Sequence, residues 1–141
     1  MAIAFISLLT LNPFKNDVQT FSERLNNFVS KSQELTKTYQ DEIGNWKMKI
    51  HDNLTMASIT DVYLPRFEEL VNKAKNLTVP KGYENIKSSF IQSLESEINS
   101  YKHFKNYLIS GNKSEDQTSI DYLSLAYQYE KVYSDFLSKN H

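Results

Sequence analysis

At 141 residues the chain has the length of one ordinary domain, which buries roughly two-thirds of its unfolded surface. Its net charge of -1 at pH 7 argues against a nucleic-acid role, which needs a basic face to neutralise phosphates. The absence of cysteine excludes thiol catalysis, disulfides and thiolate metal sites. With only 3 glycines and 3 prolines, the chain is poor in turn residues, which favours a few long helices.

Residues 1–13 are expected to form an apolar N-terminal arm or an anchor remnant. The first 11 residues carry no charge, and a helix of that length reaches about 16 Å, short of the ~30 Å hydrocarbon core of a bilayer. The basic segment and cleavage site of a complete signal peptide are missing. A trimmed export segment, an interfacial anchor, and an arm packed on the bundle or on a partner stay open. The side chains that would make this contact are Ile3, Phe5, Ile6, Leu8, Leu9 and Leu11.

Residues 18–50 have the strongest periodicity in the chain. Apolar or small residues recur at steps of three and four, with one extra step of four near Gly44. This pattern predicts a long amphipathic helix with a coiled-coil-like seam, capped by Asn16 or Asp17 and ended by Asp52-Asn53. The predicted seam is Val18, Phe21, Leu25, Phe28, Ser32, Leu35, Tyr39, Ile43, Trp46 and Ile50.

A second helix is predicted from about residues 55–58 to Thr78. Pro65 lies inside its pattern, and because the apolar spacing continues through the proline, we expect one kinked helix instead of two. The Val79-Pro80-Lys81-Gly82 segment is then a turn. The predicted seam is Ile59, Val62 or Tyr63, Phe67, Leu70, Ala74 and Leu77.

A third helix is predicted over residues 83–110, closed by Gly111-Asn112 as a left-handed cap. Its apolar face is Tyr83, Ile86, Phe90, Leu94, Ile98, Tyr101, Phe104 or Lys105, and Leu108. Ser114 or Asp116 is expected to cap a fourth helix that extends to about Ser138. The seam of the fourth helix is Tyr122, Ala126, Tyr129, Tyr133 and Phe136, and Leu125 and Val132 widen it.

Four amphipathic helices with short connections predict an all-α fold. The arrangement is a four-helix up-and-down bundle with a long first helix and a Pro-kinked second helix, forming a single domain over residues 14–141. In this topology the arm, the turn at residues 79–82 and the C-terminus share one end. The turns at residues 52–53 and 111–112 share the other end.

Three Asn-x-Ser/Thr sequons are candidate glycosylation sites, at Asn53, Asn76 and Asn112. Chance alone gives about two such triplets in this composition, so their positions matter more than their number. Asn53 and Asn112 fall on turns at the end away from the arm, where an externally facing bundle would expose them. The alternative is that both asparagines are helix caps.

The histidines form no recognisable metal or catalytic motif. A di-iron bundle uses Glu-x-x-His pairs, but neither His51 nor His103 has a glutamate three residues before it. His103 lies off the apolar face and is expected to be exposed. The only hint of an internal carboxylate cluster comes from the seam-edge residues Glu42, Glu97 and Glu130. We therefore predict no catalytic residue, cofactor, metal or small-molecule substrate, and the chain is not expected to be an enzyme.

Tyrosines crowd the third and fourth helices. Each has an apolar body with a polar tip, which suits interfaces as well as the rim of a bundle. Tyr127 points away from the main seam, so Tyr127 and Tyr107 are the candidate partner surface.

Several strings carry a resemblance over residues 17–137. They are Val18-Gln19-Thr20-Phe21, Gly44-Asn45-Trp46, Tyr63-Leu64-Pro65-Arg66-Phe67, Ser93-Leu94-Glu95-Ser96-Glu97, and Tyr107-Leu108 followed by Gly111-Asn112. With them the chain resembles a group of uncharacterised small helical proteins, expected to be exported or membrane-anchored, of ammonia-oxidising archaea. The resemblance implies an extracytoplasmic location and no functional residues to transfer.

Two hypotheses of function follow from the sequence. The first is a non-enzymatic binding or structural bundle associated with the cell envelope, extracytoplasmic or membrane-anchored, and held through its arm. The second is a soluble cytoplasmic regulator or immunity-type inhibitor that acts by protein–protein contact through the tyrosine-rich fourth helix. A protein partner or a homo-oligomer fits either hypothesis, and nucleic acid fits neither.

Overall fold

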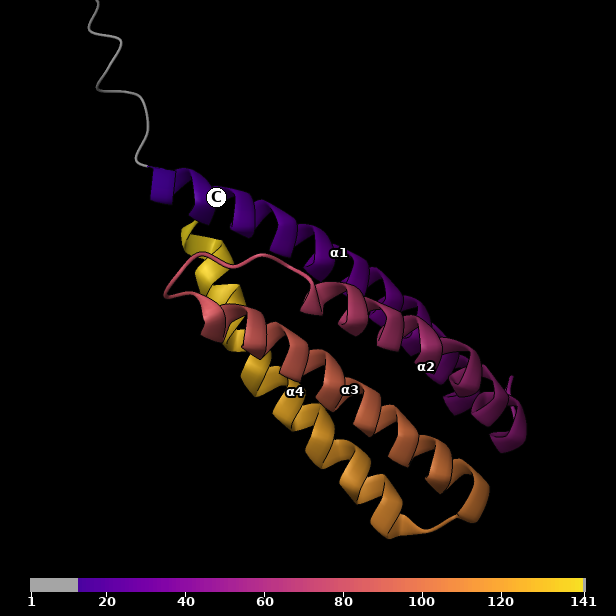
Figure 1. Cartoon of the computed structure of the whole chain (residues 1–141). Helices are drawn as coiled ribbons and strands as arrows, with labels where there is room; N and C mark the ends of the chain where they lie inside the picture. The colour runs from indigo at the N-terminus through magenta and orange to yellow at the C-terminus, as the bar shows by residue number, and fades with distance from the viewer. Residues whose placement is uncertain (1–12, 141) are drawn as a thin grey trace, which may run out of the picture.

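The computed structural model describes residues 13–140, which fold into four antiparallel helices (Figure 1). The helices are α1 (Pro13–Lys47), α2 (Asn53–Lys75), α3 (Glu84–Ser110) and α4 (Lys113–Lys139). The predicted all-α four-helix bundle is confirmed, and α1, at 35 residues, is the longest helix, as expected. No described helix is long and apolar enough to cross a membrane. The predicted arm contacts of residues 1–11 lie outside the described residues.

Several helix ends differ from the prediction. α1 begins at Pro13, so Asn16 and Asp17 lie inside the helix and do not cap it, and α2 ends at Lys75, before the predicted Thr78. At the other ends local capping chemistry overrides periodicity. α1 ends at Lys47, and Lys49 then adopts a left-handed conformation with φ 62°. Asp52 does not close α1; its carboxylate accepts a hydrogen bond from the Thr55 N–H and caps α2. Asn112, and not Ser114 or Asp116, caps α4 by accepting from the Ser114 N–H.

The cap of α3 and the continuity of α2 agree with the prediction. Gly111 closes α3 in the left-handed region at φ 69°, a conformation that favours glycine because it has no Cβ. α2 runs through Pro65 without a break, as one helix. Phe67, Ala74 and Leu77 are buried as predicted. At the other seam positions the buried residue lies one place further along the helix: Thr60, Leu64 and Val71 in place of Ile59, Tyr63 and Leu70.

The core lies along the apolar faces of α1, α2 and α3, and the C-terminal part of α4 adds Tyr133, Phe136 and Leu137 to it. Every residue predicted on the α3 face from Ile86 to Leu108 is buried, taking Phe104 as the alternative to Lys105. Two predictions at the edges are wrong: Ile50 and Val132 are exposed. Ile50 follows the left-handed turn at Lys49, which rotates it off the seam.

A second face of α3 is made of small residues and packs closely on α4. Ser89, Ser93, Ser96 and Ser100 are all buried at helical spacing. The Ser93 hydroxyl donates to the carbonyl of Ala126 at 3.0 Å, and the Ser100 and Ser119 hydroxyls are 3.1 Å apart. Small side chains allow two helix axes to approach, so α3 and α4 form the tightest pair in the bundle.

α4 meets α1 at one end only. Near the start of α1, Phe21 packs on Phe136 with ring centroids 5.5 Å apart, and Ser22 donates to the Asn140 carbonyl. Away from this end α4 follows α3 and diverges from α1 (Figure 1). The side of the bundle between α1 and α4 is therefore incompletely closed.

Candidate functional site

The candidate site is a groove of about 280 Å³ between α1, α3 and α4. It lies on the incompletely closed side of the bundle. α3 supplies the floor with Ser93, Leu94 and Glu97. The α1 wall is Ser32, Gln33, Thr36, Lys37 and Gln40, and the α4 wall is Leu123, Ala126, Tyr127, Glu130 and Tyr133.

Glu97 is the ionisable group on the groove floor. Its Oε1 accepts hydrogen bonds from the Thr36 hydroxyl of α1 and from the Tyr101 hydroxyl one turn along α3, both at 2.5 Å. The other oxygen, Oε2, receives neither bond. Because every fully buried side-chain N or O of the described residues has a partner, Oε2 is not fully buried, and it faces the groove that Glu97 lines. Burial raises the pKa of Glu97, and the negative charge of Glu130 acts in the same direction. The sequence placed Glu97 and Glu130 at seam edges; the fold brings these two to one groove and leaves Glu42 elsewhere.

A line of hydroxyl groups continues from Glu97 into the core. The Tyr101 ring packs on Tyr39 with centroids 4.3 Å apart, and the Tyr39 hydroxyl lies 2.8 Å from Thr60 Oγ1 on α2. Burial raises the pKa of Tyr39 and Tyr101 well above the ordinary value, so both phenols remain protonated. Glu97 is thus held by hydroxyl groups of α1 and α3, and the packing of Tyr101 on Tyr39, which is itself bonded to α2, fixes one of these donors in place.

Sequence reasoning missed this network. The available signal was weak: Glu97 and Tyr101 are one turn apart on α3, a spacing that permits a side-chain hydrogen bond but does not require one. Thr36 and Thr60 carry no signal at all, because their partners come from other helices.

The two walls of the groove have different chemistry. On α4, Leu123 and Tyr127 lie one turn apart on the groove wall, and Tyr127 is 62% exposed. The facing α1 wall has only polar and charged side chains. The groove therefore offers an apolar strip, a polar strip and a carboxylate between them.

The predicted partner tyrosines are not brought together. Tyr127 lines the groove, whereas Tyr107 on α3 is half-buried against the core and is not part of the groove lining. The described residues contain no group of three or more histidine, aspartate and glutamate side chains that could hold a metal ion.

The three sequon asparagines are exposed, and each has a structural role. Asn112 caps α4, the Asn53 side chain accepts a hydrogen bond from the Trp46 Nε1–H at 2.8 Å, and Asn76 follows the last residue of α2 as its C-cap. Asn53 and Asn112 lie at the end of the bundle predicted for them, and Asn76 lies toward the other (Figure 1).

The two internal histidines each pair with a glutamate, which the sequence reasoning did not foresee. His51 Nε2 lies 2.7 Å from Glu42 Oε2, and His103 Nδ1 lies 2.6 Å from Glu115 Oε2. His103 is half-buried instead of exposed, because its ring stacks on Tyr122 across the α3–α4 pair. Its hydrogen bond lowers the pKa of Glu115.

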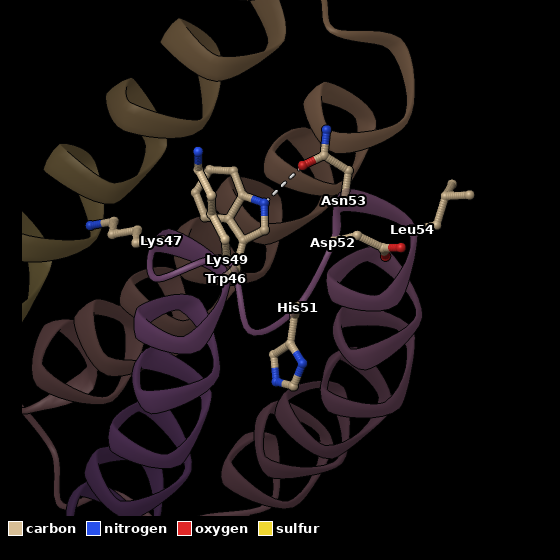
Figure 2. Close-up of a pocket in the computed structure, with 7 residues that line it drawn as sticks. All are labelled: Trp46, Lys47, Lys49, His51, Asp52, Asn53 and Leu54. Atoms are coloured by element: carbon tan, nitrogen blue, oxygen red, sulfur yellow. Dashed lines mark hydrogen bonds between the residues drawn. The ribbon is translucent and has the colours of Figure 1, made fainter.

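A second, open hollow of about 770 Å³ lies at the turn between α1 and α2 (Figure 2). Its lining is Trp46, Lys47, Lys49, His51, Asp52, Asn53 and Leu54. The Trp46 ring packs edge-on against Phe104 of α3 at 5.2 Å, and its N–H is bonded to Asn53. Figure 2 shows Leu54 directed away from the bundle.

No protein family, curated protein or solved structure matches the chain. The resemblance to small archaeal helical proteins therefore stays a prediction.

Proposed function

We propose that this chain is a non-enzymatic binding bundle that receives a helical segment of a partner protein in the groove between α1, α3 and α4. The observation that supports the proposal is the divergence of α4 from α1, which leaves a lined groove where a closed bundle has an interface between those two helices. A partner helix completes the packing on that side.

The chemistry of the walls suits an amphipathic helix. Its apolar face covers Leu123 and Tyr127 on α4, which removes the most exposed aromatic ring of the described chain from water. Its polar face lies against α1. A tyrosine of this kind provides a large contact area at low conformational-entropy cost.

The floor of the groove favours a lysine or arginine on that helix. The carboxylates of Glu97 and Glu130 both line the groove, and the charge of Glu130 acts on Glu97. A cation between them offsets both their mutual repulsion and the desolvation of Glu97. Lys37 on the rim is paired with Asp41 at 3.7 Å in an exposed i,i+4 contact, which an acidic side chain further along the partner helix replaces.

A photo-crosslinking amino acid at position 127 tests the groove, and position 62 on α2, which is also exposed, is the matched control. In cells that express the full chain, we expect crosslinks to a discrete protein from position 127 only. Leu123→Asp and the exposed Lys37→Glu should each reduce that product, with circular dichroism confirming that both variants are folded. Equal products from positions 127 and 62, or crosslinks only to a second copy of this chain, contradict the proposal.

The cellular location belongs to the proposal as well. We propose a cell-envelope association, extracytoplasmic or membrane-anchored, based on the uncharged segment of residues 1–11 and on the archaeal resemblance. In that setting Asn53 and Asn112 are the candidate glycosylation sites, because both are exposed on turns. Fractionation of cells and the intact mass of the purified chain test these points. Recovery only in the soluble cytoplasm with an unmodified mass supports the alternative, a cytoplasmic regulator that uses the same groove.

A further inference from the structure

The turn between α1 and α2 carries a second surface, unrelated to the groove. Met48, Ile50 and Leu54 are 66%, 65% and 69% exposed, the highest values among the large apolar side chains of the described residues. Lys47 and Lys49 alternate with them and are also exposed. We call these five residues the tip surface. Three such aliphatic side chains within seven residues are unusual on a soluble face and indicate a contact.

The two positive charges of the tip surface have no partner among the described residues. Lys47 and Lys49 form no ion pair with any residue that the structure describes. The nearby carboxylates are engaged: Glu42 with His51, and Asp52 with the Thr55 N–H at 2.7 Å. The lysines therefore present their charge to whatever covers the apolar side chains.

The α3–α4 turn lies at the same end of the bundle and adds one exposed aliphatic side chain but no excess of positive charge (Figure 1). Ile109 is 58% exposed and Lys113 has no ion pair among the described residues. Glu115 is bonded to His103, and Asp116, in the first turn of α4, is the carboxylate without a partner described for it.

We propose that the tip surface docks on an anionic lipid membrane. Met48, Ile50 and Leu54 enter the boundary between headgroups and acyl chains, and Lys47 and Lys49 lie at the headgroup phosphates with their methylene stems against the apolar layer. A protein partner needs matching walls, such as those of the groove. Separate apolar side chains interspersed with lysines suit a fluid interface, which adapts to each of them.

The turn is already fixed in the conformation that docking requires. The Trp46 ring is wedged against Phe104, its N–H is bonded to Asn53, and the Ile50 N–H is bonded to the Asn45 carbonyl. Little backbone freedom is lost on binding, so a small apolar surface suffices for a reversible contact.

Vesicle binding of the full chain tests the proposal, with Trp46 as the reporter because it is the only tryptophan. We expect flotation with vesicles of phosphatidylcholine and phosphatidylserine, weak flotation with phosphatidylcholine alone, and weaker binding at high salt. Brominated lipids should quench Trp46. The M48S/I50S/L54S variant should bind at least about tenfold more weakly than the wild type. The K47Q/K49Q variant should lose the preference for phosphatidylserine.

The V62S/V132S variant is the control, since it removes two exposed apolar side chains elsewhere on the bundle. It should bind as the wild type does. The proposal is wrong if the M48S/I50S/L54S variant floats and is quenched like the wild type, because the arm then accounts for the binding. It is also wrong if no anionic vesicle is bound, or if the tip substitutions abolish a dimer measured by sedimentation and leave vesicle binding unchanged.

Discussion

Glu97 is the residue whose ionisation is most closely tied to the packing of the bundle. Its Oε1 is held by hydroxyls from α1 and α3, while Oε2 faces the groove. Because burial raises its pKa above the ordinary 4.5, the folded chain holds this proton more tightly than the unfolded chain does. The resulting stabilisation is complete below pH 4.5 and is lost as the pH rises through the raised pKa.

The Glu97→Gln variant tests this assignment. Glutamine keeps an acceptor for Thr36 and Tyr101 but carries no charge. We expect the free energy of unfolding of the variant, relative to the wild type, to increase between pH 4.5 and the raised pKa and to be constant above it. Urea unfolding at a series of pH values measures the difference.

Glu69→Gln is the control for this experiment. Glu69 is exposed, and its hydrogen bond to Lys73 lowers its pKa, so the sign is opposite: its contribution is present at neutral pH and is lost on acidification. A stability difference for Glu97→Gln that does not change with pH contradicts the assignment.

Within α2, Pro65 is a local defect that the helix tolerates. It lies in the middle of the helix, it is exposed, and it cannot donate to the carbonyl of Asp61. Pro65→Ala should restore that bond and raise the free energy of unfolding by about 1–3 kcal/mol. Thermal unfolding followed by circular dichroism measures the gain. Asn72→Ala, at another exposed position of α2, should change stability by less than about 0.5 kcal/mol. A loss of stability for Pro65→Ala means that the proline ring makes a native contact that alanine lacks.

Between α3 and α4, close approach depends on the buried serines. Ser100 is almost completely buried, and its hydroxyl lies 3.1 Å from that of Ser119. Ser100→Leu should force the two helices apart and cost about 1–3 kcal/mol. Ser100→Ala, which loses only the hydrogen bond, should cost about 1 kcal/mol. Urea midpoints rank the variants, and an equal cost for both contradicts the role of side-chain size.

The helices differ in how well the sequence predicts their faces and ends. The α3 face was predicted correctly because its apolar spacing is unbroken and Gly111 ends it with a residue that favours a left-handed cap. The boundary between α1 and α2 was predicted incorrectly, because an aspartate such as Asp52 can either follow the end of one helix or cap the start of the next. Extending the seam past that boundary placed Ile50 in the core, whereas it lies on the tip surface.

The groove was less predictable than the helices. Seam-edge positions such as Glu97 and Glu130 are solvated or enclosed according to where a neighbouring helix lies, and periodicity within one helix does not contain that information. Tyr127 was identified as a surface residue from its own helix. The role of Thr36 depends on α1 and α3 together.

For the whole molecule, α3 is the central element, because it packs on each of the other three helices. Opening α3 requires the loss of all these interfaces, so its amides should exchange last and at a free energy close to that of global unfolding. Native-state hydrogen exchange followed by mass spectrometry or NMR measures this order. Slower exchange in α1 or α4 than in α3 contradicts it.

The length of α1 has a mechanical consequence. A helix of 35 residues is about 52 Å long. It begins at Pro13, directly after the uncharged segment, and ends beside the tip surface. The start of α1 at Pro13 is therefore about 5 nm from the tip surface, with the groove open along the side. α1 thus sets a fixed distance between its first turn and the tip surface, and shortening α1 by two turns should bring the two about 11 Å closer.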